Sequence, residues 1–395
     1  MTALGVVLTL ALGSEPNRLT VDTHLHVTMA RQVFFFSGEP GSRTLTWSTR
    51  PKTTNQVDGD QMLSSGGQLA LATIFPPVRL RPGRTSHDEA LYQLWQVRKF
   101  CREQPQFACV GTAAEARAAI RKGRIALLPS LEGGEGIDSA ADVDRVYAAG
   151  ARSVTLVHFA TTHLGGAAAD QHTYNVFSKV TGVLNPTGLT ETGREVVERM
   201  FQLGMIVDLS HASDETSRGV LELAEKHGVP VINSHGGARA FLGMERNIPD
   251  DLAARIAKGG GMVGMTASDH QVAQVPDTVK WEGYVPGTCD DTIAHWKHLA
   301  DVVTPERVTL GSDFNGMIAR PRPGGECPDG IRNTGDLNAL YDGLVKHGIP
   351  KEAIDGMGWR FLEMWEVLEQ RADPAALGEA KAADPRPNSA FNVAM

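Results

Sequence analysis

Short apolar runs alternate with longer amphipathic stretches along most of the chain. Eight of these runs have the length expected of buried strands: Leu19–Val21, Leu69–Ile74, Ile125–Leu128, Ser153–Val157, Met205–Leu209, Val229–Ile232, Met262–Met265 and Val308–Leu310. Strands that alternate with helices form parallel sheets, and eight such units close into a barrel. The pattern therefore predicts an α/β fold, a (β/α)₈ TIM-type barrel with long βα loops.

Helical patterns occupy most of the intervals between these runs. They cover Asp88–Arg102, Ala113–Lys122, Ala140–Ala149, Glu191–Leu203, Asp214–His227, Asp250–Lys258 and Asp290–Val302. Thr190 and Ser213 directly precede two of the helices, where a hydroxyl group can cap the first turn. The alternative fold, an open doubly wound sheet, more usually carries a glycine-rich phosphate turn after its first strand. The sequence has no such turn there, so the closed barrel is favoured.

The regular pattern is interrupted twice and stops before the C-terminus. The segment from Val27 to Gly67 is long for a connection between a strand and a helix, and its run Phe34–Phe36 predicts an irregular lid. A second irregular stretch runs from His163 to Pro186. We therefore expect three parts: a leader or N-terminal arm at residues 1–16, the barrel at 17–371, and a mobile Ala/Pro-rich tail at 372–395.

Charge and hydropathy argue against two classes of partner. The net charge is −8, with acidic and basic residues interspersed, whereas binding to nucleic-acid phosphates requires a basic surface. No apolar run reaches the roughly 18–20 residues of a membrane-spanning helix. The first 13 residues are apolar and uncharged. If they are a shortened signal peptide, the protein is periplasmic or secreted; otherwise they form an arm against the barrel and the protein is cytoplasmic.

The cysteines give weaker evidence, which concerns zinc binding and disulfide formation. Cys101, Cys109, Cys289 and Cys327 have no C-x-x-C spacing, so a cysteine-bound zinc ion is not expected. We predict isolated buried thiols, with one disulfide as the alternative if the protein is exported.

Side chains able to bind metal follow the predicted strands repeatedly. The carboxyl ends of barrel strands meet at one face, where barrel enzymes place their active sites. His24 and His26 lie two positions apart on a strand and therefore point to the same side. Later strands are followed by Glu132, His158, Asp208, His211, His235 and Asp313. Each residue alone fits a structural role, such as a cap or a turn, but their joint placement predicts a metal site. Histidine and carboxylate ligands without thiolates suit zinc, although manganese, iron and cobalt bind similar sites.

The sequence is similar to the renal-dipeptidase-like membrane dipeptidases of the amidohydrolase superfamily, from about Leu19 to Leu368. The most specific matches are Glu132-Gly133-Gly134, Gly188-Leu189-Thr190 with Gly193, Leu203 to His211, Pro230 to His235, Arg246 to Asp251, and Gly311 to Phe314. This resemblance implies a metallodipeptidase with two divalent metal ions, zinc first among them, and a small peptide as substrate. It also implies a homodimer as one candidate assembly.

The resemblance implies which residues bind the metals. His24 would bind the first ion, Glu132 would bridge both ions, and His211 and His235 would bind the second. His26 stands where the family normally has the aspartate of a His-x-Asp motif. The broader superfamily uses His-x-His, which implies that His26 also binds metal. Asp208 is expected to orient a ligand or cap a helix instead.

The resemblance also implies a division of the chemistry. Asp313, a further metal ligand, would shuttle the proton, and His158 would orient the substrate carbonyl and the tetrahedral intermediate. Arg246 would bind the free carboxylate of the substrate through its paired donors. Two metal ions bridged by Glu132 would acidify a shared water, and the hydroxide would attack the peptide carbonyl. The alternative for Arg246 is a salt bridge on the barrel rim with Asp250–Asp251.

The histidine at position 26 leads to a testable hypothesis. An imidazole in place of a carboxylate makes the site one charge more positive, which favours the ionised form of the bridging water. We therefore expect an activity optimum at lower pH than in typical relatives. The variant His26→Asp should move the acidic limb of the pH–rate profile to higher pH. An unchanged profile would contradict the hypothesis.

Three alternative functions remain open from the sequence. Lactonases and phosphotriesterases commonly bridge their metals with a carboxylated lysine after the fourth strand, and no lysine stands at a comparable strand end here. The family usually has an asparagine a few residues after His158, whereas this chain reads Phe159-Ala160-Thr161-Thr162-His163. A different amide or an N-acyl amino acid is therefore the second alternative. The third is a non-hydrolytic, biosynthetic family member that binds or isomerises a peptide.

Overall fold

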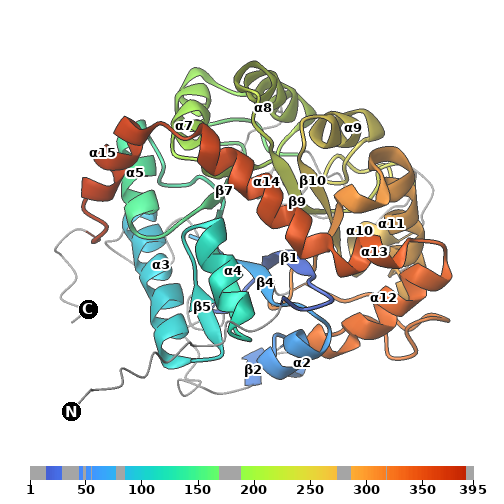
Figure 1. The fold of residues 1–395 in the computed structure, drawn as a ribbon. Helices are drawn as coiled ribbons and strands as arrows, with labels where there is room; N and C mark the ends of the chain where they lie inside the picture. The colour runs from blue at the N-terminus through green and yellow to red at the C-terminus, as the bar shows by residue number, and fades with distance from the viewer. Residues whose placement is uncertain are drawn as a thin grey trace, which may run out of the picture.

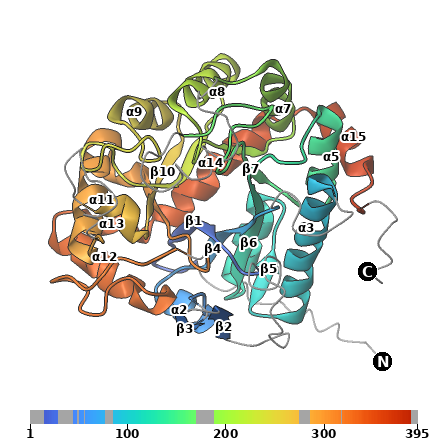
Figure 2. The same cartoon turned by 180° about the vertical axis from the view of Figure 1, so that it is seen from behind.

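A closed parallel barrel forms the centre of the molecule. The computed structural model describes residues 15–28, 44–47, 50–54, 56–76, 85–168, 188–273, 286–316 and 318–387. Within these ranges, eight strands make the barrel seen in Figures 1 and 2: β1 (Val21–Leu25), β4 (Leu69–Ile74), β6 (Ile125–Glu132), β7 (Ser153–Thr155), β8 (Ile206–Asp208), β9 (Ile232–Gly236), β10 (Met262–Thr266) and β11 (Val308–Gly311). They pair in the order β4-β1-β11-β10-β9-β8-β7-β6, and β4 also pairs with β6, which closes the ring. The predicted fold class is confirmed.

Helices surround the barrel on the outside (Figures 1 and 2). The larger ones are α3 (Ser86–Glu103), α4 (Ala113–Arg121), α5 (Ala140–Ala148), α7 (Glu191–Gln202), α8 (Asp214–His227), α9 (Asp250–Lys258), α11 (Cys289–Val303), α12 (Leu337–Lys346) and α14 (Met357–Arg371). Thr190 and Ser213 cap α7 and α8, as predicted, by accepting hydrogen bonds from Gly193 N and Thr216 N. Among the described helices, none has the length and apolar character needed to cross a membrane.

The strands are buried on both faces, which explains their sequence pattern. Every residue of β1, β4, β6 and β9 is buried. A barrel strand packs against side chains in the interior on one face and against helices on the other, so it carries a continuous apolar run rather than an alternating one. The helices contribute large, fully buried side chains to this core, including Trp296 of α11 and Trp365 of α14.

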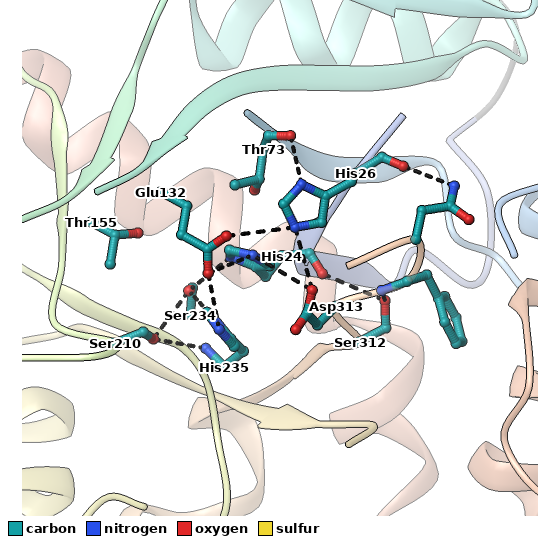
Figure 3. Close-up of polar contacts among 12 residues, drawn as sticks. His24, His26, Thr73, Glu132, Thr155, Ser210, Ser234, His235, Ser312 and Asp313 are labelled. Carbon is teal, nitrogen blue, oxygen red and sulfur yellow. Dashed lines mark hydrogen bonds and ion pairs between the residues drawn. The ribbon is translucent and has the colours of Figure 1, made fainter. Parts of the chain in front are cut away.

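Several strands extend further than their apolar runs suggested. The first, third and sixth runs ended at Val21, Leu128 and Ile232, but β1 continues to Leu25, β6 to Glu132 and β9 to Gly236. The added residues include His24, Glu132 and His235, and the side chains of the two histidines point toward that of Glu132 (Figure 3). Polar residues end a hydropathy signal even where the backbone continues as a strand.

The long segment after β1 contains more regular structure than predicted. Strand β2 (Thr44–Trp47) pairs antiparallel with β3 (Arg50–Thr54), and the short helix α2 (Gly59–Ser64) follows. Asp58 caps α2 by accepting two backbone N–H hydrogen bonds. The run Phe34–Phe36, on which the expected lid rested, lies outside the described residues.

Other short elements complete the fold, and two of them correct expectations. Strand β5 (Phe107–Cys109) pairs with β6 outside the barrel ring; three residues are too short for a periodic signal. Helix α15 (Pro374–Ala382) packs beside α5 (Figure 1), so this part of the tail is not the mobile arm that we expected. Its proline occupies the first turn, where the missing N–H is tolerated. The remaining elements are α10 (Asp269–Val272), α13 (Lys351–Asp355) and the 3₁₀ turns Pro305–Arg307 and Thr334–Asp336.

Three further sequence-based expectations concern segments that lie partly outside the described residues. The leader at residues 1–14, residues 169–186 of the stretch after His163, and residues 388–395 of the tail all lie outside the described residues.

The four cysteines, which all lie in described ranges, form two disulfides. Cys101 pairs with Cys109, with Cα atoms 5.7 Å apart, and Cys289 pairs with Cys327, with Cα atoms 5.9 Å apart. The prediction of isolated thiols was therefore wrong. Cys101 lies in the last turn of α3 and Cys109 lies in β5, so the short connection between these two elements brings the thiols together. The second pair joins the start of α11 to the loop after β11. These two segments are far apart in the sequence, and only the folded barrel brings them together.

Candidate active site

The predicted site residues meet at the carboxyl end of the barrel in one buried cluster. They are His24 in β1, His26 directly after it, Glu132 at the end of β6, His158 after β7, His211 after β8, His235 in β9 and Asp313 after β11. Figure 3 shows that the side chains of this cluster which it labels, those of His24, His26, Glu132, His235 and Asp313, point toward one another. Strand ends that are far apart in sequence thus supply a single set of nitrogen and oxygen atoms.

One oxygen of Glu132 is the centre of this cluster. Its Oε1 atom lies 3.1 Å from His211 Nε2, 3.4 Å from His24 Nε2, 3.4 Å from His158 Nε2 and 3.5 Å from His235 Nε2. The Nε2 atoms of His211 and His235 are 3.1 Å apart. Ligands bound tetrahedrally to zinc at about 2.0–2.1 Å lie about 3.3 Å from one another. The spacing of Glu132, His211 and His235 therefore fits a metal ion.

A second set of ligands lies on the other side of Glu132. His26 Nε2 is 3.7 Å from Glu132 Oε2 and 3.3 Å from Asp313 Oδ1, and His24 Nε2 is 4.0 Å from the same Asp313 oxygen. The Nε2 atoms of His24 and His26 are buried and have no hydrogen-bond partner among the described residues. Buried polar atoms normally have a partner, and a cation would provide one. The groups His24–His26–Glu132 and Glu132–His158–His211 are each compact enough to hold a metal ion.

The other ring nitrogens are held by neighbouring groups, which orients the imidazoles. His26 Nδ1 lies 3.0 Å from the carbonyl oxygen of Thr73 at the end of β4, an acceptor that requires a proton on Nδ1. The lone pair of His26 is therefore on Nε2, facing the cluster. His235 Nδ1 is 2.9 Å from Ser234 Oγ. Such outer contacts fix the tautomer of a metal-binding histidine.

Asp208 supports the cluster without taking part in it. Its Oδ1 accepts hydrogen bonds from Ser210 N and Ser234 N at 3.0 and 2.8 Å. Its Oδ2 accepts from Thr155 Oγ1 and Ser234 Oγ, both at 2.6 Å. Asp208 lies close enough to His24 and His235 for a third compact group, but both of its oxygens are already occupied. It links β7, β8 and β9 and, through Ser234, the ring of His235; the sequence had suggested such an orienting role.

The loop after β11 is held against β1 in an unusual backbone conformation. Asp313 has a φ of 55°, a left-handed conformation that non-glycine residues adopt rarely and often at functional sites. Asp313 N donates to His24 O at 2.8 Å, and Arg320 donates to the carbonyls of Ser312 and Asp313. Sequence reasoning missed Arg320, because only the fold turns its buried guanidinium back toward Asp313.

Neighbouring groups of opposite charge shift the pKa values of the two carboxylates and of His24. Burial alone would raise the pKa of Glu132, but the surrounding histidines, His158 and His24 first, hold it well below its ordinary value. Burial lowers the pKa of His24, but the carboxylates of Glu132 and Asp313 outweigh this effect and raise it to about 9. Burial likewise disfavours ionised Asp313, yet the His26 imidazole, 3.3 Å away, and the charge of His24 lower its pKa. Both carboxylates are therefore ionised.

His158, His211 and His235 are neutral, because for these three residues the effect of burial on the pKa outweighs the attraction of the carboxylates. Burial lowers the pKa of His158 to about 4, although Glu132 opposes the shift. Burial and the positive charge of Arg246 hold the pKa of His211 well below its ordinary value. Burial, the charge of His24 and that of Arg246 have the same effect on His235. Neutral imidazoles and ionised carboxylates are the protonation states that bind divalent metals, so a cation bound at His24 would displace the proton that its raised pKa retains.

Arg246 lies beside the histidines of β8 and β9. Its Nη1 donates to the carbonyl of His235 at 2.8 Å, and its Nη2 is 3.1 Å from His211 Nε2. The acidic residues that the sequence offered as rim partners are engaged elsewhere, Asp250 with His298 and Asp251 with Arg218. A buried guanidinium next to the metal-binding atoms is well placed to attract an anionic group of a ligand.

The fold and the site together define a metal-binding (β/α)₈ barrel with histidine and carboxylate ligands. The sequence pattern of the membrane dipeptidase family (peptidase family M19) matches residues 16–378, and the chain belongs to this family. An uncharacterized dipeptidase of Schizosaccharomyces pombe is 32% identical over 279 residues, which cover 69% of this chain and 60% of that protein. Dipeptidase 3 of Rattus norvegicus is 30% identical over 285 residues, covering 71% and 52%. The chain thus matches only about half to 60% of the length of these relatives.

Solved structures show the same fold at low sequence identity. The probable dipeptidase PvdM from Pseudomonas aeruginosa superposes with a TM-score of 0.71 and 17% identity, covering 90% of this chain and 96% of that one. A metallopeptidase from Rhodobacter sphaeroides, liganded with a phosphinate mimic of the dipeptide L-Ala-D-Ala, has a TM-score of 0.63 and 20% identity, covering 88% and 99%. At this identity the likeness establishes the fold alone.

Proposed function

We propose that the protein is a zinc-dependent dipeptidase that hydrolyses the peptide bond of a dipeptide and releases two amino acids. The observation that carries the proposal is the convergence of four imidazole Nε2 atoms on one oxygen of Glu132. His26 and Asp313 extend the cluster on the other side. Membership of a dipeptidase family supports the choice of substrate.

The cluster has ligands for two divalent cations. His24, His26 and Asp313 would hold one ion, His211 and His235 would hold the other, and Glu132 would contact both. When bound, the two ions polarise a carbonyl group and lower the pKa of a water molecule. The mixture of imidazole nitrogens and carboxylate oxygens in the cluster suits zinc, whereas magnesium and calcium prefer ligand sets made of oxygen alone.

The protein's own side chains would position the substrate and move the proton. Asp313 is ionised, and its side chain remains 11% exposed, so it can accept a proton from the attacking water and return it to the departing amine. His158 is neutral at working pH and can donate a hydrogen bond to the oxygen of the scissile carbonyl as negative charge develops there. Arg246 would bind the substrate's free carboxylate.

A panel of dipeptides tests the proposal directly. Zinc-loaded protein would be assayed with L-Xaa-L-Xaa and L-Xaa-D-Xaa dipeptides; the D series is included because the Rhodobacter sphaeroides neighbour was studied with a mimic of L-Ala-D-Ala. We expect hydrolysis of several members and loss of at least about a hundredfold in His211→Ala, since the variant lacks a ligand of one ion. No hydrolysis despite about two bound zinc ions per chain would reject the proposal. A different amide or a non-hydrolytic role would then be favoured.

We further infer that the protein matures in an oxidising compartment, since two disulfides form and persist there rather than in a reducing cytosol. Protein isolated under denaturing conditions with an alkylating agent should contain no free thiol. Alkylation of all four cysteines would contradict this inference.

A further inference from the structure

Two phenylalanines form an aromatic wall beside the metal-binding cluster. Phe75 follows β4, and Phe159 follows His158 after β7. The ring of Phe75 lies 4.5 Å from that of His158 in an edge-to-face arrangement, and 6.1 Å from that of Phe159. The centroids of the His158 and Phe159 rings are 3.5 Å apart. We call Phe75 and Phe159 the aromatic wall.

The wall is more exposed to solvent than the two histidines that it contacts, His158 and His211. Phe159 is 36% exposed, whereas His158 and His211 are each only 6% exposed. The ring of Phe159 also approaches that of His211, at 5.7 Å and nearly perpendicular. The ring of Phe159 is therefore partly open to solvent and at the same time in contact with two histidines of the cluster, so a ligand bound at these histidines can reach it.

The position of the wall identifies the part of a dipeptide that it would contact. If His158 binds the scissile carbonyl, the nearest substrate side chain is that of the N-terminal residue, which supplies this carbonyl. Arg246 approaches His211 from β9, and the carboxylate bound there belongs to the C-terminal residue. The wall comes from β4 and β7 instead. The two residues of the substrate therefore meet different surfaces.

We propose that the aromatic wall selects dipeptides with a bulky apolar side chain at the N-terminal residue. This proposal rests on the proposed dipeptidase function and deepens it. The wall offers aromatic carbon surface, and an apolar side chain packed on it is removed from water, which favours leucine or phenylalanine over glycine at this position. Phe159 is thus a specificity-determining residue.

The first test compares two matched substrate series on the zinc-loaded enzyme. The values of kcat/KM would be measured for Xaa–Ala and Ala–Xaa dipeptides, with Xaa as Gly, Leu, Phe or Lys. We expect Phe–Ala to exceed Gly–Ala by roughly tenfold or more, a ratio typical of one apolar contact. Phe159→Ala should reduce this ratio to below about threefold and should leave the ratios of the Ala–Xaa series within about twofold. Val367→Ala, which removes an exposed apolar side chain from α14 far along the chain, should keep the wild-type ratios.

A second measurement does not depend on turnover. Calorimetry would compare phosphinate dipeptide mimics that carry a benzyl or a methyl group at the N-terminal position. Tighter binding of the benzyl mimic to the wild type, lost in Phe159→Ala, would support the wall even if no dipeptide were hydrolysed and the proposed function failed. Equal affinities, a preference for Lys–Ala over Leu–Ala, or an unchanged ratio in Phe159→Ala would each overturn the proposal.

Discussion

The variant Glu132→Gln should lose both metal binding and activity. We expect kcat/KM for dipeptides to fall at least about a thousandfold, because bridged metal ions supply several kcal/mol of transition-state stabilisation. Bound zinc should fall below one ion per chain. Glu132 Oε1 contacts four imidazoles, and a neutral amide provides neither the charge nor the second oxygen that two cations require. Turnover and elemental analysis of dialysed protein would measure the two effects.

The matched control for this variant is Glu135→Gln. Glu135 lies three residues further on, in the loop after β6, and burial raises the pKa of its carboxyl to about 7, so it is partly protonated at neutral pH. The control makes the same chemical change without touching the Nε2 atoms of the cluster, and it should keep zinc and activity near wild-type levels. If Glu132→Gln retained two zinc ions and more than a few per cent of activity, the bridging role would be rejected.

Removing the disulfide between Cys289 and Cys327 should have the largest effect on stability. The double variant Cys289→Ala/Cys327→Ala opens a loop whose ends are 38 residues apart. Loop-closure entropy predicts a loss of roughly 4 kcal/mol in the free energy of unfolding. The same loop contains Arg320, which hydrogen-bonds the carbonyls of Ser312 and Asp313, so the zinc affinity should fall as well. Urea unfolding followed by circular dichroism would measure the change.

The second disulfide provides an internal comparison. Cys101 and Cys109 are 8 residues apart, so Cys101→Ala/Cys109→Ala should lower the free energy of unfolding by less, roughly 2.5 kcal/mol. It lies between α3 and β5, away from the loop after β11, and should leave zinc affinity unchanged. Equal stability losses in the two variants, or none, would contradict the loop-length explanation.

Local sequence patterns were sufficient for the eight barrel strands, their order and most of the helices between them. Each barrel strand is buried on both faces and gives a continuous apolar run, and each helix has one apolar face and gives a helical period, so both signals can be recognised without knowing which elements pack together. Strand β5 was missed because three residues carry no period. Helix α15 was missed because its proline suggested a break, although proline is favourable in a first helical turn.

The sequence by itself determined the barrel and, through the order of its strands, the face at which His24, Glu132, His211 and Asp313 would gather. This inference needs no coordinates, because the carboxyl ends of parallel barrel strands must share one face. Only the tertiary structure decided which atoms touch. It places Glu132 Oε1 between four imidazoles, turns Arg320 toward Asp313, pairs Cys289 with Cys327 and sets Phe159 beside His211. These contacts join residues far apart in the chain, and their distances depend on how strands and helices pack, which no local pattern records.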